Sequence, residues 1–199
     1  MRTIDFWFSV GSTYTYLAVM RLEAIAKQSG IRFFPRPFSV RAIMREMDNV
    51  PFANKPVKAA YMWRDIGRRA QARGLHPNLP APYPLREFDR ANRVAVVAAE
   101  EGWCEAYLRA TYRRWFEDGD EAGSEPNLSA SIVEAGQEPE RVIAAAEAER
   151  VARAYADATD AARQLGIFGS PTFVVDGELF WGDDRLEDAV LWCERGSLA

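Results

Sequence analysis

Ser12 is the first residue of this chain whose type and position suit chemistry. The apolar run Phe6-Trp7-Phe8 is followed by a turn ending at Gly11, and Ser12 then opens a segment with helical periodicity. The open N-terminus of a helix presents unpaired N–H groups and partial positive charge, which stabilise an anion such as a thiolate. Ser12 can donate its O–H to the same anion. The alternative is that Ser12 is an ordinary helix N-cap.

A proline between a turn and an apolar run marks a second candidate. Pro171 follows Ser170 in GSPTFVV, just before an expected strand. A proline at the entry to a strand indicates an edge, a bulge or a cis peptide bond. A cis bond would turn the backbone groups of Ser170 outward, where they can pair with an extended peptide. A trans proline that only begins a strand is the alternative.

Two polar clusters lie at expected starts of helices. Asp183 and Asp184 follow an apolar run in FWGDDRLEDA, and either carboxylate can cap a helix or hold a ligand ammonium. Asn54 precedes Lys55 and a proline in ANKPVK, where it is placed to cap a helix with Lys55 and Lys58 near a pocket. Taken alone, each cluster also fits an ordinary helix start.

The elements that must position these residues can be read from hydrophobic periodicity and breakers. Strands are expected at 3–10 and 31–37, and Pro35 indicates that the second ends early or lies at an edge. Two short strands flank Asp176-Gly177, a strong hairpin signal. The pattern predicts helices at 13–29, 40–48, 57–73, 88–101, 104–117, 128–135, 139–165 and 184–194. A break near Glu147 is expected within the helix at 139–165.

This order of elements predicts an α/β protein with a thioredoxin-like fold (β-α-β … β-β-α) and a large inserted all-helical subdomain. The β-bearing ends cannot bury their faces alone, but together they form one sheet covered by helices. We therefore predict a discontinuous thioredoxin-like domain formed by residues 1–39 and 166–199. Residues 40–165 form the inserted helical subdomain.

Composition narrows the function classes. The 199 residues carry a net charge of −4 without a basic run, which argues against a nucleic-acid partner. No apolar stretch approaches the ~20 residues of a membrane span, and the N-terminus does not resemble a signal peptide, so we expect a cytoplasmic protein. The two cysteines form no Cys-x-x-Cys pair, and His76 is the only histidine. We therefore expect free thiols and no metal site.

Four segments together resemble one family. They are DFWFSVGSTYTYLA, ANKP, the run FGSPTFVVDGELFWGDDRLE and the helical insertion. The chain resembles, over nearly its whole length, the 2-hydroxychromene-2-carboxylate isomerases and kappa-class glutathione transferases in the DsbA-like branch of the thioredoxin fold. It departs from the family pattern where Thr13 replaces a proline, Ser9 an aspartate, and Ser170 a valine or leucine.

The resemblance implies that glutathione is the cofactor and assigns its binding to Ser12, Asn54, Ser170, Pro171, Asp183 and Asp184. Ser12, the catalytic residue, would hydrogen-bond the glutathione sulfur in place of a redox cysteine. The backbone of Ser170, before a cis-proline, would bind the cysteinyl part. The two aspartates would bind the γ-glutamyl end, and Asn54 would lie at the active site.

The resemblance also implies a reaction. The glutathione thiolate would add to 2-hydroxychromene-2-carboxylate or a related intermediate of aromatic compound catabolism. The ring would then open, a carbon–carbon bond would rotate, and glutathione would leave.

Aromatic side chains, including Trp63 and Trp181, are candidates for lining the substrate pocket; the alternative is that they pack in the core. Basic residues are candidates for binding the substrate carboxylate. The substrate candidates are Tyr14, Arg36, Lys55, Lys58 and Tyr83. The family is often a homodimer, but no hydrophobic seam can be read here.

Three other functions compete with the isomerase. A kappa-type transferase or peroxidase would use the same residues to join glutathione to electrophiles. A DsbA-like dithiol oxidoreductase is disfavoured, because that chemistry needs a resolving thiol. A non-catalytic thioredoxin-like module would hold a peptide at the edge near Pro171.

Overall fold

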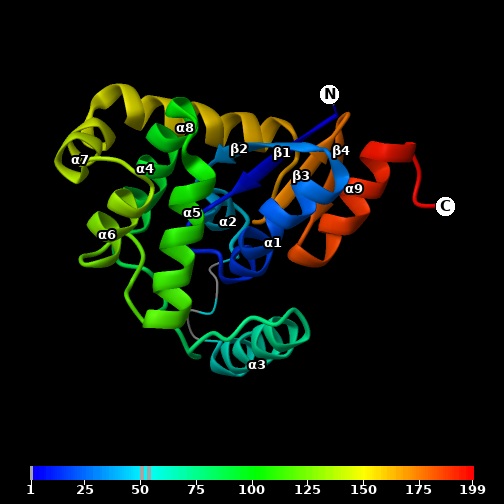
Figure 1. The fold of residues 1–199 in the computed structure, drawn as a ribbon, viewed down its shortest axis with the longest axis horizontal. Helices are drawn as coiled ribbons and strands as arrows, with labels where there is room; N and C mark the ends of the chain where they lie inside the picture. The colour runs from blue at the N-terminus through cyan, green and yellow to red at the C-terminus, as the bar shows by residue number, and fades with distance from the viewer. Residues whose placement is uncertain (1, 50–51, 53–54) are drawn as a thin grey trace.

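A computed structural model describes residues 2–49, 52 and 55–199 (Figure 1). Its sheet has the strand order β2-β1-β3-β4. The β1–β2 pair is parallel, and the β1–β3 and β3–β4 pairs are antiparallel. The strands are β1 (Thr3–Phe8), β2 (Arg32–Pro37), β3 (Thr172–Val175) and β4 (Glu178–Trp181). The first strands and the C-terminal hairpin thus share one sheet, as the element order predicts.

The helices follow the predicted order. The predicted break near Glu147 is confirmed, because Ala148 is extended, with φ −64° and ψ 143°. The helix expected at 104–117 ends as an α-helix at Arg113 and continues as a π-helical turn, Arg114–Asp118. The α-helices are α1 (Thr13–Ser29), α2 (Val40–Glu46), α3 (Pro56–Ala72), α4 (Phe88–Glu101), α5 (Cys104–Arg113), α6 (Asn127–Glu134), α7 (Pro139–Glu147), α8 (Glu149–Gln164) and α9 (Leu186–Arg195).

Both turn predictions for the strands agree with the structure. Asp176 and Gly177 join β3 to β4 with φ values of 50° and 87°, the positive pair that a tight hairpin needs. Strand β2 lies at an edge of the sheet, as Pro35 indicates. The backbone N–H of Arg32 donates to the carbonyl of Arg2, just before β1, and that of Phe38 donates to the carbonyl of Phe8. The alternating pattern therefore places Pro35 where an N–H would face away from β1. Pro35 therefore removes no hydrogen bond between β1 and β2. Because it has no N–H, the open edge of β2 is a poor template for pairing with another strand.

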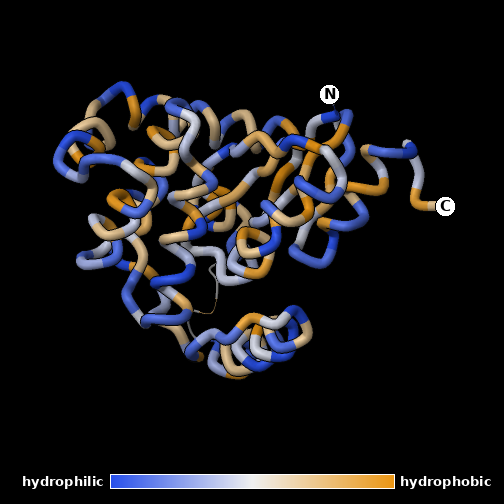
Figure 2. Tube along the Cα trace, in the orientation of Figure 1, coloured by the Kyte–Doolittle hydropathy of each residue, from blue (hydrophilic) through white to orange (hydrophobic). Residues whose placement is uncertain are grey.

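The inserted helices share the hydrophobic core of the sheet. Phe6 and Phe173 stack across β1 and β3 with ring centroids 5.4 Å apart. Tyr16 of α1 stacks on Phe116 of the π-helical turn, with centroids 4.2 Å apart and ring planes 3° apart. Figure 2 shows hydrophilic and hydrophobic residues alternating along the outer helices, as expected where one face is buried. The boundaries of the two predicted domains remain a prediction.

None of the described helices combines the length and apolar content that a bilayer crossing requires.

Asn92 of α4 ties the insertion to the turn after β1. It is fully buried. Its Oδ1 accepts the Val10 N–H at 2.7 Å, and its Nδ2 donates to the carbonyl oxygens of Val10 and Phe88, each at 2.8 Å. The side chain thus satisfies both backbone groups of Val10, next to the turn that holds Ser12.

We expect Asn92→Ala to lower the free energy of unfolding by about 2–3 kcal/mol, because it leaves buried backbone groups of Val10 unpaired. Equilibrium denaturation in urea measures this change. The exposed Asn49 provides the control, and Asn49→Ala should change the unfolding free energy by less than about 0.5 kcal/mol. Equal effects of the two substitutions would show that the hydrogen bonds of Asn92 contribute nothing.

Candidate functional site

Ser12 stands at the N-cap position of α1, but its side chain does not cap the helix. Its backbone is extended, with φ −81° and ψ 119°, and its hydroxyl makes no capping hydrogen bond. Instead, Oγ donates to the carbonyl oxygen of Ser170 at 2.6 Å. The N-terminus of α1 therefore lacks a serine cap, and the hydroxyl crosses to the loop before β3.

Gly11 brings the turn close to α4. Its φ is +118°, which an L-residue rarely adopts, and a Cβ at this position would lie 2.6 Å from Cδ2 of Phe88. Only glycine lets the backbone between β1 and α1 lie against that ring. The turn before Ser12 is thus held by α4 as well as by β1.

The Ser170-Pro171 peptide bond is cis. The side chain of Ser170 points into the β1–α1 turn, where Oγ accepts the backbone N–H of Ser9 at 2.9 Å and lies 3.0 Å from Oγ1 of Thr15. Two of the three positions that depart from the family pattern, Ser9 and Ser170, are therefore hydrogen-bonded to each other. Three hydrogen bonds, including the one from Ser12, join the cis-proline loop to the turn and to the first turn of α1.

Tyr112 of α5 contacts the turn between β1 and α1 through its hydroxyl. Its hydroxyl lies 3.2 Å from the carbonyl oxygens of both Ser9 and Ser12. The side chain is fully buried, and burial raises the pKa of its hydroxyl, so the group stays protonated and donates. Nothing in the local sequence distinguishes Tyr112 from the other aromatic residues of the insertion. Its position under the turn follows only from the packing of α5 against α1.

The acidic pair after β4 divides into one buried and one exposed carboxylate. Asp183 is only 1% exposed. Its Oδ1 accepts Nη1 of Arg69 at 2.9 Å, its Oδ2 pairs with Arg73, and its backbone oxygen accepts Nη2 of Arg21 at 2.8 Å. The side chain of Asp184 is 41% exposed and lies 3.4 Å from Nη2 of Arg69. Asp184 thus has the more accessible carboxylate for a ligand ammonium, and both assignments remain predictions.

Helix α3 binds the start of α1 as well as the acidic pair. The Tyr14 hydroxyl donates to Oδ2 of Asp65 at 3.0 Å, and Nε of Arg69 lies 3.1 Å from the same oxygen. Partial burial, followed by the bond to Asp65, raises the pKa of Tyr14. Tyr14, predicted to contact substrate, thus contacts α3 through its hydroxyl.

Some of the predicted aromatic residues meet. Tyr83 is half-buried, and its ring centroid lies 6.0 Å from those of both Trp63 and Phe52. Burial raises the pKa of the Tyr83 hydroxyl. Trp181 is 53% exposed and packs on Phe168 instead, with centroids 4.7 Å apart. Trp63 and Tyr83 therefore form one cluster, which Trp181 does not join.

The basic candidates differ in their surroundings. Arg36 is exposed on β2, and its Nε lies 3.1 Å from Oδ1 of Asp5 on the neighbouring strand. Lys55 and Lys58 are exposed at the start of α3. The predicted glutathione-binding residue Asn54 lies outside the described residues. Arg36 thus has an acidic partner, whereas the two lysines lie at the surface.

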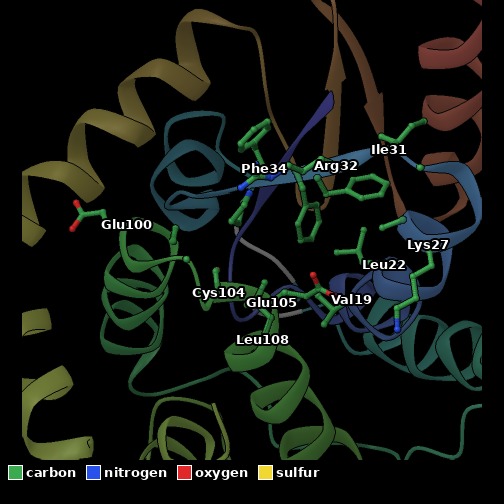
Figure 3. A pocket seen from close by; sticks show the side chains of 17 residues that line it. Val19, Leu22, Lys27, Ile31, Arg32, Phe34, Glu100, Cys104, Glu105 and Leu108 are labelled. Carbon is green, nitrogen blue, oxygen red and sulfur yellow. The ribbon is translucent and has the colours of Figure 1, made fainter. Parts of the chain in front are cut away.

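A cavity of about 760 Å³ lies between α1, β2 and α5 (Figure 3). Its lining on α1 begins at Val19, about 10 Å along the helix axis from Ser12. None of the predicted site residues that the structure describes lines it. Cys104, which does, is buried with a raised thiol pKa, and both cysteines are free, as expected.

Together, the strand order and a helix N-terminus facing a cis-proline loop define a thioredoxin-like protein, and the predicted α/β fold is confirmed. The model of the DSBA-like thioredoxin domain family matches residues 3–190, so the chain belongs to that family.

Known relatives carry the names that the sequence resemblance suggests. The chain is 27% identical over 188 residues to a 2-hydroxychromene-2-carboxylate isomerase of Sphingobium xenophagum, covering 94% of this chain and 95% of that relative. It is 29% identical over 205 residues to glutathione S-transferase kappa 1 of Caenorhabditis elegans, covering 92% of this chain and 86% of the other. A solved 2-hydroxychromene-2-carboxylate isomerase superposes with a TM-score of 0.85 at 25% identity, covering 97% and 95% of the two chains.

Proposed function

We propose that the protein is a glutathione-dependent isomerase acting on 2-hydroxychromene-2-carboxylate or a related aromatic-degradation intermediate, as a cytoplasmic homodimer. The observation that carries the proposal is the 2.6 Å contact between the Ser12 hydroxyl and the carbonyl of Ser170, the residue before the cis-proline. This contact places an O–H donor, a helix N-terminus and an extended backbone segment together. The names of the relatives support the same activity.

The residues of the turn fit the cysteinyl part of glutathione. The Ser170 backbone N–H makes no hydrogen bond with the described part of the chain, and its carbonyl receives only the Ser12 hydroxyl there. An extended peptide pairs with such a segment by accepting from its N–H and donating to its carbonyl. Ser170 would therefore bind the ligand backbone, and Ser12 would face the ligand sulfur.

Bound glutathione would supply a thiolate nucleophile that adds to the conjugated substrate and later leaves. The protein would raise the thiolate fraction, because the helix N-terminus and a hydrogen bond from Ser12 both favour the anion. An unperturbed cysteine thiol has a pKa of about 8.5, and lowering it by one unit corresponds to about 1.4 kcal/mol. This is within the range of one hydrogen bond to a charged group.

Ser12 is a donor in this proposal and not a nucleophile. A nucleophilic serine needs a neighbouring base that takes its proton. The acceptor of the Ser12 proton is an amide carbonyl, which does not take a proton at neutral pH. His76 is exposed in the loop between α3 and α4 and makes no hydrogen bond to Ser12.

The substrate would lie against the half-buried pair Trp63 and Tyr83. Lys55 and Lys58 at the start of α3 are the more accessible candidates for its carboxylate, because Arg36 is paired with Asp5. Tyr14 would contribute by holding α3 through Asp65.

Calorimetry with glutathione, followed by product analysis, tests the proposal. We expect glutathione to bind and the chromene carboxylate to be converted into a rearranged product that contains no glutathione. A stable glutathione conjugate would instead favour the kappa-type transferase, the alternative that two relatives support by name. Absence of glutathione binding would refute both activities.

A further inference from the structure

We propose that Ser12 changes its hydrogen-bond acceptor when glutathione binds, and that the cysteinyl amide N–H of glutathione triggers the change. In the free protein the Ser12 hydroxyl donates to the Ser170 carbonyl. The incoming N–H replaces Ser12 as the donor to that carbonyl, and the Ser12 proton turns to the sulfur. This inference rests on the proposed function and deepens it.

Ser12 has a single hydroxyl proton. The direction of its bond is unambiguous, because the carbonyl oxygen of Ser170, 2.6 Å away, can only accept. An O–H committed to this short bond is not available to a thiolate. Stabilisation of a bound sulfur by Ser12 therefore requires that the bond to Ser170 breaks.

The Ser170 carbonyl cannot simply follow the hydroxyl away. The side chain of the same residue is held by the Ser9 N–H at 2.9 Å and lies 3.0 Å from Oγ1 of Thr15, and both of these residues are fully buried. Pro171 is buried on the other side. If Ser12 left, this fixed carbonyl would lose its only partner among the described residues, and an unpaired carbonyl in a partly buried site is unfavourable.

A ligand peptide N–H that donates to the Ser170 carbonyl removes the cost of leaving that carbonyl unpaired. An extended ligand beside Ser170 donates one N–H to its carbonyl and accepts from its N–H, which makes no bond to the described chain. In glutathione the N–H of the cysteinyl residue belongs to the same residue as the thiol, so the group that releases Ser12 arrives together with the group that Ser12 must stabilise. Thiols without this amide gain less from Ser12, which would make the site selective for a peptide thiol.

A depsipeptide analogue of glutathione, with an ester oxygen in place of the cysteinyl N–H, tests the exchange. The full-length protein is saturated with either ligand, and the thiol pKa of the bound ligand is measured from thiolate ultraviolet absorbance against pH. For each ligand, the thiolate fraction when bound to wild type is compared with that of the free ligand. We expect this increase to be about tenfold larger for glutathione than for the analogue. Tenfold corresponds to about 1.4 kcal/mol.

The Ser12→Ala variant isolates the part of the effect that passes through Ser12. We expect the two bound ligands to become alike in this variant, whereas Ser197→Ala, at a half-buried position near the C-terminus, should keep the full difference. Because Ser12 does not cap α1, the alanine variant should retain the wild-type circular dichroism spectrum.

Two results would overturn the proposed exchange of acceptors but not the proposed function. One is that wild type lowers the thiol pKa of both ligands equally. The other is that the difference in thiol pKa between the two bound ligands persists in Ser12→Ala. Failure of wild type to bind glutathione would overturn both.

Discussion

Replacing Ser12 by alanine is expected to lower kcat/KM of the glutathione-dependent isomerisation by about tenfold to a hundredfold. The substitution removes the hydroxyl that donates to the Ser170 carbonyl from the N-cap position of α1. A hydrogen bond to a charged group contributes about 1.5–3 kcal/mol, which sets this range. The helix N-terminus remains, so some thiolate stabilisation should survive the change.

The pH profile shows whether the loss has the proposed cause. A missing donor destabilises the thiolate, so the apparent pKa for the rise of kcat/KM should move upward by about one unit, towards that of a free thiol. The activity deficit should therefore shrink as the pH is raised. Unfolding in urea provides the control. Ser12→Ala leaves the Ser170 carbonyl without its donor, so it should lower the free energy of unfolding by about 1–3 kcal/mol while the protein stays folded under assay conditions. Wild-type activity in this variant would show that Ser12 has no role.

Asp183→Ala is expected to lower the free energy of unfolding by about 3–5 kcal/mol, the range for removing one partner of a buried ion pair. The Asp183 carboxylate is 1% exposed. One of its oxygens pairs with Arg69 of α3 and the other with Arg73, the residue that follows α3. Without the carboxylate, these two guanidinium groups lose their shared partner beside Arg21, and like charges remain. We expect α3 to loosen first, which limited proteolysis detects as earlier cleavage within Pro56–Ala72.

Asp184 supplies a matched control on the adjacent residue. Its side chain is 41% exposed, and its contact with Arg69 is 3.4 Å long, so Asp184→Ala should cost at most about 1 kcal/mol. If the two aspartates served only to bind the γ-glutamyl end, both variants would weaken glutathione binding and neither would change stability. Equal unfolding midpoints for the two variants would contradict the structural role assigned to Asp183.

The elements of this protein could be predicted because their causes are local. The hairpin at Asp176-Gly177, the edge position of Pro35 and the break after Glu147 each follow from the backbone preferences of a few neighbouring residues. The ends of the elements were predicted less closely: the strand expected at 3–10 ends at Phe8, and the π-helical turn after Arg113 has no signal in the sequence. The position of Ser12 at the start of α1 is local in the same sense.

The contacts of the candidate site depend on residues far apart in the chain. Asn92 and Tyr112 could not be singled out, because nothing in their own helices distinguishes them from core residues. Each owes its role to backbone groups near Ser12 that only the packing of α4 and α5 brings within reach. The sequence likewise suggests Asp183 only as a helix cap or a partner for a ligand ammonium, and the placement of α3 makes it a buried partner of arginines.

The sequence by itself determined the α/β class, the order of strands and helices, and the candidate positions of Ser12, Ser170 and Pro171. Only the tertiary structure decided that the Ser12 hydroxyl donates to Ser170 instead of capping α1. The physical reason is that a hydroxyl has several acceptors within its reach, and the fold decides which of them is near. Here a loop more than 150 residues away provides the acceptor.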